Sequence, residues 1–127
     1  MDNYIWISED IAILIHDDLI REYGGSFGIR DAGLLSSALA RAKNIYLYEG
    51  KTLIFLAAAI AYGIVKNHPF IDGNKRTAFQ VMFAFLKVNG KTLNVAESEV
   101  VFTMIDLAEG KIQEDDLVNW LEKYLCP

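Results

Sequence analysis

Cysteine, proline and a basic leader are scarce or missing in this chain of 127 residues, and each shortage excludes a class of protein. Cys126 is the only cysteine, so no disulfide can form within the chain, and we expect a cytoplasmic protein. The two prolines leave no proline-rich linker and suit a helical domain. The first residues, Met1-Asp-Asn-Tyr, carry no basic segment, so no secretory signal is expected.

Positive charge and long apolar runs are also in short supply. Acidic residues outnumber basic ones by 17 to 12, giving a net charge of −5, whereas a sequence-independent nucleic-acid binder needs a basic face. Hydrophobic residues make up 53% of the chain, but the longest uncharged run covers only 52–65. A membrane helix needs about 20 such residues. We therefore expect no direct nucleic-acid partner, no membrane span, and a single domain, 1–127, with its own core.

The pattern of apolar residues predicts an all-α domain, a compact bundle of about six helices. Helix caps and apolar periodicity place five of these helices at about 9–23, 32–43, 74–89, 97–109 and 115–125. The remaining helix, the third, is capped by Thr52 and breaks before Pro69. Residues 44–51 are predicted to be a loop, either a flap over a site or a plain surface connection. The short apolar segments 4–7 and 91–95 predict a minor β pairing with each other.

Between the third and fourth predicted helices lies the most polar stretch of the chain, His68-Pro-Phe-Ile-Asp-Gly-Asn-Lys-Arg-Thr77. Each residue has an ordinary explanation when taken alone. The histidine can cap a helix, Asp-Gly-Asn can be a turn, and Lys75-Arg76 can be a solvated face. The glycine spacing of a Walker A loop is absent, and His16, the only other histidine, lies in no zinc-ligand spacing. We interpret His16 and Asp17 as residues that form hydrogen bonds on or between helices.

The coincidence of these residue types favours a site for phosphoryl or nucleotidyl transfer. Backbone N–H groups of Gly73 and Asn74 would open a helix and point outward, which suits an anion. Lys75 and Arg76 add two cations that can hold phosphate oxygens. Asp72 is placed to hold a Mg²⁺ ion that bridges phosphates. His68 can take a proton from an incoming hydroxyl.

The same stretch resembles the signature of the Fic/Doc family, in the Doc form that has lysine after the asparagine. The resemblance to the death-on-curing (Doc) branch covers nearly the whole chain. It includes Ile15-His-Asp17, Tyr23-Gly-Gly25, Gly28-Ile-Arg-Asp31, Leu35-Ser-Ser-Ala-Leu39 and Lys87-Val-Asn-Gly90. The resemblance implies an all-α Fic core and transfer from ATP, with Mg²⁺, to a protein hydroxyl. It also implies the general base at His68, the Mg²⁺ ligand at Asp72, and phosphate binding by 73–76.

One departure bears on the reaction type. Fic enzymes that transfer AMP have glycine where this chain has Lys75, and a second arginine where it has Phe79. Doc toxins are similar to this chain in that respect, and they are kinases of a threonine in elongation factor Tu that arrest protein synthesis. The resemblance therefore implies a toxin kinase. AMP transfer and a non-catalytic module that binds a nucleotide or partner remain the alternatives.

The resemblance also implies a partner. Doc toxins are inhibited by a small Phd-like antitoxin, whose disordered tail folds as a helix in a groove of the toxin. Fic enzymes that inhibit themselves carry a Ser/Thr-x-x-x-Glu-Gly/Asn helix. Neither Glu-Gly pair fits, because Ile45 and Ile105 occupy the positions four residues before Glu49 and Glu109. We therefore expect inhibition to come from another chain.

Overall fold

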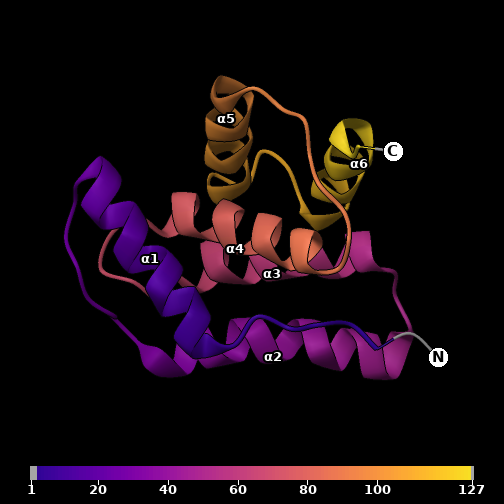
Figure 1. Ribbon diagram of the computed structural model, residues 1–127, viewed down its shortest axis with the longest axis horizontal. Helices are drawn as coiled ribbons and strands as arrows, with labels where there is room; N and C mark the ends of the chain where they lie inside the picture. Colours follow the sequence, from indigo (N-terminus) through magenta and orange to yellow (C-terminus); the bar gives the residue numbers. More distant parts are fainter. Residues whose placement is uncertain (1–2, 127) are drawn as a thin grey trace.

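The apolar run that the sequence places in the core forms the central helix, α3 (Leu53–Asn67). In a computed structural model that describes residues 3–126, five other helices complete the bundle, and α2, α4, α5 and α6 pack directly on α3 (Figure 1). They are α1 (Glu9–Tyr23), α2 (Ala32–Glu49), α4 (Asn74–Val88), α5 (Glu97–Ala108) and α6 (Glu114–Tyr124). The predicted all-α bundle is confirmed. No helix within residues 3–126 has the length and apolarity that crossing a membrane requires.

The first two helices begin and end at capping residues visible in the sequence. The side chain of Ser8 accepts the N–H of Ile11 at 3.2 Å, and Asp31 accepts the N–H of Leu34 at 3.1 Å. α1 ends before Gly24, whose φ of 87° is open to glycine. Thr52 lies at the predicted cap of α3, but its side chain makes no capping hydrogen bond. The caps therefore fix the ends of α1 and α2, whereas α3 depends on its burial.

The prediction that residues 44–51 form a loop is wrong. α2 continues to Glu49 and stops at Gly50, which adopts the left-handed conformation. The buried positions Ala38, Ala42 and Ile45 continue one helical face through this segment. The C-terminal end of α2 also lies at the opposite end of the molecule from residues 68–73, so it is no flap over them (Figure 1).

The predicted pairing of 4–7 with 91–95 is also wrong. The N–H and C=O of Ile5 bond instead to the side chain of Asn89, at 2.8 and 2.9 Å. Residues 91–95 pair with 124–126 at the end of the chain. An asparagine amide has the donor and acceptor that a neighbouring strand would supply, so the first segment needs no strand partner.

Aromatic rings explain why the N-terminal segment lies where it does. Trp6 stacks on Phe85 of α4 with ring centroids 5.1 Å apart, and Tyr4 meets Tyr46 of α2 at 5.2 Å. Such pairs add about 0.5–1.5 kcal/mol beyond the area they bury. Tyr46 therefore belongs to a packed aromatic cluster, which favours continuation of α2 over a loop.

An ion pair joins α2 to α6, the last helix. Arg41 of α2 donates two hydrogen bonds to the carboxylate of Glu114, at 2.6 and 2.9 Å. This hydrogen bonding raises the pKa of Arg41 above its ordinary value. The contact lies far along the chain from the polar stretch and has a structural role.

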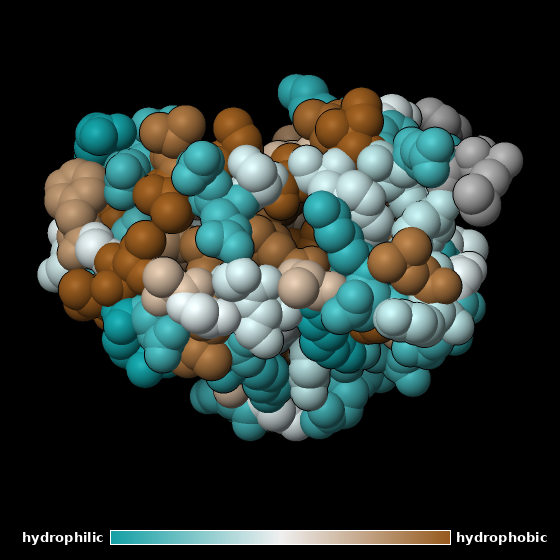
Figure 2. Space-filling view, turned by 90° about the horizontal axis from the view of Figure 1, so that it is seen from below, coloured by the Kyte–Doolittle hydropathy of each residue, from teal (hydrophilic) through white to brown (hydrophobic). Residues whose placement is uncertain are grey.

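Apolar side chains are unevenly distributed over the surface. On the face shown in Figure 2, apolar residues are denser toward the side of α1 and the segment that follows it. That segment, residues 24–31, is called the connector below. The exposed apolar residues of α1 and the connector include Ile11, Leu14, Phe27 and Ile29. This side of the molecule also carries the polar stretch.

Candidate active site

A cleft of about 620 Å³ is lined by the chain between α3 and α4, by α4 itself and by the C-terminal end of α1. Figure 1 shows that the end of α3, the start of α4 and α1 lie on the same side of the molecule. The chain between α3 and α4, residues 68–73, is called the site loop below. All six residues predicted for the site line this one cleft: His68, Asp72, Gly73, Asn74, Lys75 and Arg76. The structure therefore brings the predicted residues together.

The backbone of His68 is held in an unusual conformation. It is the only non-glycine residue with positive φ in residues 3–126, with φ 53° and ψ 54°. Such a conformation costs on the order of 1–3 kcal/mol and persists where the surroundings enforce it. Arg30 of the connector supplies that enforcement, because its guanidinium donates to the carbonyls of His68 and Asn67 at 2.7 and 2.8 Å. The connector thus fixes the direction in which the imidazole leaves the backbone.

The side chain of Asn74 closes the site loop from inside. Its Oδ1 accepts the N–H of Phe70, and its Nδ2 donates to the C=O of Phe70, both at 2.9 Å. These two bonds fix which way the amide points, and Nδ2 lies 3.2 Å from Nδ1 of His68. Nδ1 of His68 is therefore the acceptor, and the neutral ring carries its proton on Nε2.

Asp72 is exposed but tightly oriented. Its Oδ1 accepts the N–H of Gly73 at 2.8 Å, and its Oδ2 accepts the N–H of Ser26 from the connector at 3.0 Å. Each carboxylate oxygen has two acceptor sites, so both oxygens keep one for a further ligand. No group of three or more His, Cys, Asp or Glu side chains that could hold a metal occurs within residues 3–126. An ion at Asp72 would need the rest of its ligands from substrate and water.

The start of α4 differs in one respect from the prediction. The N–H of Gly73 is not free, because Asp72 accepts it. The backbone N–H groups of Asn74, Lys75 and Arg76 have no acceptor among residues 3–126. They form what we call the amide nest, at the positive end of the α4 dipole. The predicted anion site therefore lies one residue further along the chain than expected.

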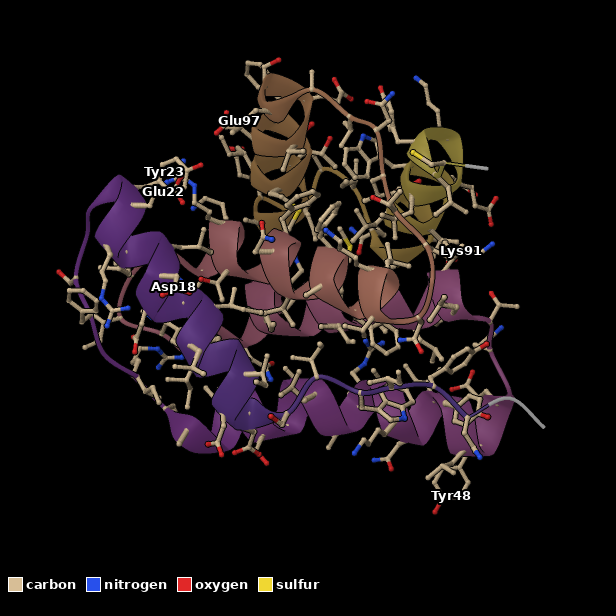
Figure 3. The ribbon with its side chains drawn as sticks, in the orientation of Figure 1. Asp18, Glu22, Tyr23, Tyr48, Lys91 and Glu97 are labelled. Carbon is tan, nitrogen blue, oxygen red and sulfur yellow. The ribbon has the colours of Figure 1, made fainter. Side chains whose placement is uncertain are left out.

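The two cations of the first turn of α4 are exposed, and neither pairs with a carboxylate among the described residues. The guanidinium of Arg76 instead lies over the ring of Tyr23, with Cζ 3.8 Å from the ring centroid. Tyr23 ends α1, and across the opening above α4 Glu97 begins α5 (Figure 3). Arg76 is thus supported by a ring, and its charge is not neutralised.

The far part of the cleft is apolar and is built by α4, α5 and the segment between them. Phe79 and Phe83 of α4 stack with centroids 6.0 Å apart and form one wall. The other wall is lined by Leu93, Val95, Val100, Val101, Met104 and Ile105. A single cleft therefore has a cationic end and an apolar end.

Tyr23, Arg30 and His16 contact the site, but the sequence predicts no role in it for any of them. Arg30 and Tyr23 reach it from other parts of the chain, at separations that local spacing cannot reveal. His16 is predicted to form hydrogen bonds on or between helices, but its hydrogen bond goes to the site loop, at the carbonyl of Asp72 2.8 Å away. For His16 the sequence offers one local signal, a polar residue among the apolar residues of a predicted helix.

Comparison with known proteins agrees with this architecture. The model of the Fic/DOC family matches residues 6–86. The chain is 38% identical over 73 residues to "Toxin Doc" of Mycolicibacterium smegmatis, a match that spans 56% of each protein. It is 31% identical over 119 residues to "Protein kinase doc" of Escherichia phage P1, covering 92% of this chain and 93% of the phage protein. The chain therefore belongs to the Fic/DOC family.

Proposed function

We propose that this chain is a Doc-like toxin that transfers the γ-phosphoryl group of Mg-ATP to a protein hydroxyl in the cytoplasm. A threonine of elongation factor Tu is the proposed acceptor, so that translation is inhibited. The observation that carries the proposal is the amide nest with two cations beside it, neither of which is paired with a carboxylate. Placing two like charges at the positive end of a helix is unfavourable unless an anion binds there.

Phosphate binding follows from the geometry of the first turn of α4. The three free N–H groups can donate to one phosphate group, as helix N-termini commonly do. Arg76 can bind two oxygens at once, and Lys75 adds a point charge. The ring of Tyr23 covers one face of the guanidinium, which leaves its N–H edges for ligand oxygens.

The residues present fit a magnesium ion. Asp72 is the proposed ligand, with free acceptor sites on an exposed carboxylate at the edge of the amide nest. Magnesium is commonly held by one or two carboxylates together with phosphate oxygens and water, so one aspartate suffices. When bound, the ion would neutralise charge on the phosphates.

His68 is the proposed general base. The acceptor hydroxyl attacks the γ-phosphorus, the bond from that phosphorus to the β–γ bridging oxygen breaks, ADP leaves, and His68 takes the hydroxyl proton. Only a ring nitrogen with an available lone pair can do this. In the tautomer selected by Asn74 the unprotonated nitrogen is Nδ1, whose single lone pair accepts the Asn74 amide. Proton transfer to either ring nitrogen therefore requires His68 to give up its hydrogen bond with Asn74.

The proposed reaction is kinase chemistry, with AMP transfer as the alternative. One support is the name of the phage P1 relative, which calls that protein a kinase. Another is Phe79, whose ring stacks on Phe83 and can bind no phosphate. This chain therefore lacks, at position 79 of α4, the second arginine that AMP-transferring members have there. A nucleotide held only by the first turn would present a different phosphate to the acceptor.

The surface around the cleft suits a protein acceptor. Phe27 and Ile29 of the connector and Ile71 of the site loop are exposed apolar residues. Ile29 lies opposite Phe70 in a short antiparallel bridge, which holds the connector beside the base and the proposed metal ligand. Exposed apolar residues around a polar centre are typical of protein–protein contact.

The proposed regulator is a small Phd-like antitoxin. The apolar end of the cleft, between α4 and α5, is suited to the apolar face of a folding helix. Neither of the two Glu-Gly pairs lies in a self-inhibitory motif, so a second chain is the proposed source of inhibition. Equal growth arrest with and without the protein encoded beside it would contradict this part of the proposal.

Labelled ATP distinguishes the proposed reaction from its alternatives. Purified protein is added to a lysate with ATP labelled at either the γ or the α position. A labelled protein with γ-label alone supports a kinase, and its identity by mass spectrometry tests the assignment to elongation factor Tu. Label from the α position indicates AMP transfer. No transfer from either, together with growth arrest that survives His68→Ala, indicates a binding module without catalysis.

A further inference from the structure

His16 of α1 is a buried polar side chain that the proposed mechanism does not use. Only 1% of its surface is exposed, and burying an imidazole is unfavourable unless it is hydrogen-bonded. Its hydrogen bond goes to the carbonyl of Asp72, 56 residues further along the chain, with an N–O distance of 2.8 Å. The carboxylate of Asp17 is 3.7 Å from the other ring nitrogen, too far for a hydrogen bond.

The hydrogen bond and the ring contact of His16 are both with the site loop. The ring stacks flat on Phe70, with centroids 4.0 Å apart and an interplanar angle of 6°. Gly73 lies beside the ring, since a Cβ added there would be 3.8 Å from Nε2, an ordinary van der Waals distance. One side chain of α1 thus contacts the loop at Phe70 and Asp72 and lies next to Gly73.

The hydrogen bond fixes more than one atom, because a peptide group is planar. The C=O of Asp72 and the N–H of Gly73 belong to the same plane and point in opposite directions. When His16 holds the carbonyl, the direction of the Gly73 N–H is fixed as well. That N–H donates to Oδ1 of Asp72 at 2.8 Å, so the orientation of the carboxylate depends on the same plane.

We propose that His16 is a positioning residue that sets the direction of the Asp72 carboxylate through the peptide plane between Asp72 and Gly73. A carbonyl oxygen only accepts hydrogen bonds, so Nε2 of His16 carries the proton. The metal-binding consequence rests on the proposed function, in which Asp72 holds Mg²⁺. The loop-positioning part does not, because it concerns contacts present without a ligand.

Two substitutions separate the hydrogen bond from the stacking. His16→Gln keeps an N–H donor and loses the ring, whereas His16→Phe keeps a ring on Phe70 and loses the donor. Asp17→Asn is the matched control, since it changes the neighbouring residue without touching the loop. Groups that orient metal ligands typically change metal affinity about 10–100-fold when removed.

Amide hydrogen exchange without nucleotide is the first measurement. We expect faster exchange at Gly73 in His16→Phe, by about ten-fold or more, little change in His16→Gln and none in Asp17→Asn. Unchanged exchange at Gly73 in a folded His16→Phe protein would overturn the proposal. If neither variant folds, ¹⁵N NMR of the unaltered protein decides, because a neutral His16 ring with no proton on Nε2 cannot donate to the carbonyl of Asp72.

Calorimetric titration of Mg²⁺ in the presence of a non-hydrolysable ATP analogue is the second measurement. We expect an affinity about 10–100-fold lower in His16→Phe than in Asp17→Asn. Equal affinities would overturn the metal-orienting role of His16. An unaltered protein that binds no Mg²⁺ would instead overturn the proposed role of Asp72, and with it the metal-orienting role, while the exchange measurement still decides the positioning of the loop.

Discussion

The two ends of α4 use the same device for different purposes. At the N-terminal end, the amide of Asn74 bonds to both the N–H and the C=O of Phe70. At the C-terminal end, the amide of Asn89 bonds in the same way to Ile5 and also donates to the C=O of Phe85. In each case the asparagine amide supplies the donor and the acceptor that a neighbouring strand would supply, to Phe70 at one end and to Ile5 at the other.

The difference lies in what each end leaves unsatisfied. Beyond Asn89, the N–H groups of Gly90 and Lys91 bond to the last carbonyls of the helix, and the end is closed. At the N-terminal end His68 is held in a strained conformation, and the three N–H groups of the amide nest have no acceptor among residues 3–126. Lys75 and Arg76 pair with no carboxylate of these residues either. Unsatisfied groups in an otherwise well-satisfied fold indicate the site more clearly than any single residue type does.

Among the changes at the N-terminal end of α4, removal of the proposed base should lower the rate of phosphoryl transfer most. His68→Ala is expected to lower the rate of phosphoryl transfer by about 10²–10⁴-fold. Binding of Mg-ATP should persist, because the imidazole is not part of the amide nest. Single-turnover transfer of γ-label checks the rate, and calorimetry checks the binding. A rate within two- to three-fold of the unaltered protein, again an order-of-magnitude criterion, would remove His68 from the mechanism.

Removing one cation from each end of α4 tests whether the two ends differ in their contribution to ATP binding. Arg76→Gln is expected to raise the KM for ATP by about ten-fold or more, because it loses charged hydrogen bonds to phosphate. Lys87→Gln removes the same charge from the last turn and should leave KM unchanged. Steady-state kinetics of the two variants checks this. Equal effects would mean that only the overall charge matters.

Replacement of the two asparagines tests whether they differ in function or only in position. Asn74→Ala and Asn89→Ala should each lower the free energy of unfolding by about 1–3 kcal/mol, since each leaves backbone groups unpaired. Only Asn74→Ala should also slow transfer, by about ten-fold, because the site loop and the tautomer of His68 depend on it. Urea unfolding and kcat at saturating ATP measure the two effects. A slower Asn89→Ala enzyme would contradict the division of roles.

The smallest effect is expected for the ring that supports Arg76. Tyr23→Leu should raise the KM for ATP about two- to five-fold, the range for a partly exposed cation–π contact. Tyr23→Phe keeps the ring and should change little. In the Arg76→Gln background, Tyr23→Leu should have no further effect, and an additive loss there would show that Tyr23 acts independently of Arg76.

Local signals were enough to predict most of the fold. Ser8, Asp31 and Gly24 mark helix ends through their own backbone preferences, and the apolar run of α3 marks the core. The sequence does not predict the extension of α2, because Tyr46 packs against Tyr4 and Trp6, which are remote in sequence. Tertiary packing overrode a weak local pattern in that segment.

In the candidate site, too, the local features could be predicted from the sequence and the contacts between distant segments could not. Residues 68–76 are contiguous, so their chemistry could be interpreted from order alone. The support that Arg30 gives to His68, and that His16 gives to Asp72, depends on contacts between distant segments. Even within the loop, the prediction of a free Gly73 N–H failed because the preceding carboxylate turns back to accept it.

The hydrogen bonds between the connector and the site loop constrain how this protein can change in evolution. The carbonyls of Pro69 and Gly28 accept N–H groups across the two segments, and Asp72 accepts the N–H of Ser26. A residue inserted into one segment would shift its bonds out of register with the other. The lengths of the connector and the site loop are therefore coupled, and we expect natural variants of this chain to lengthen elsewhere on the surface.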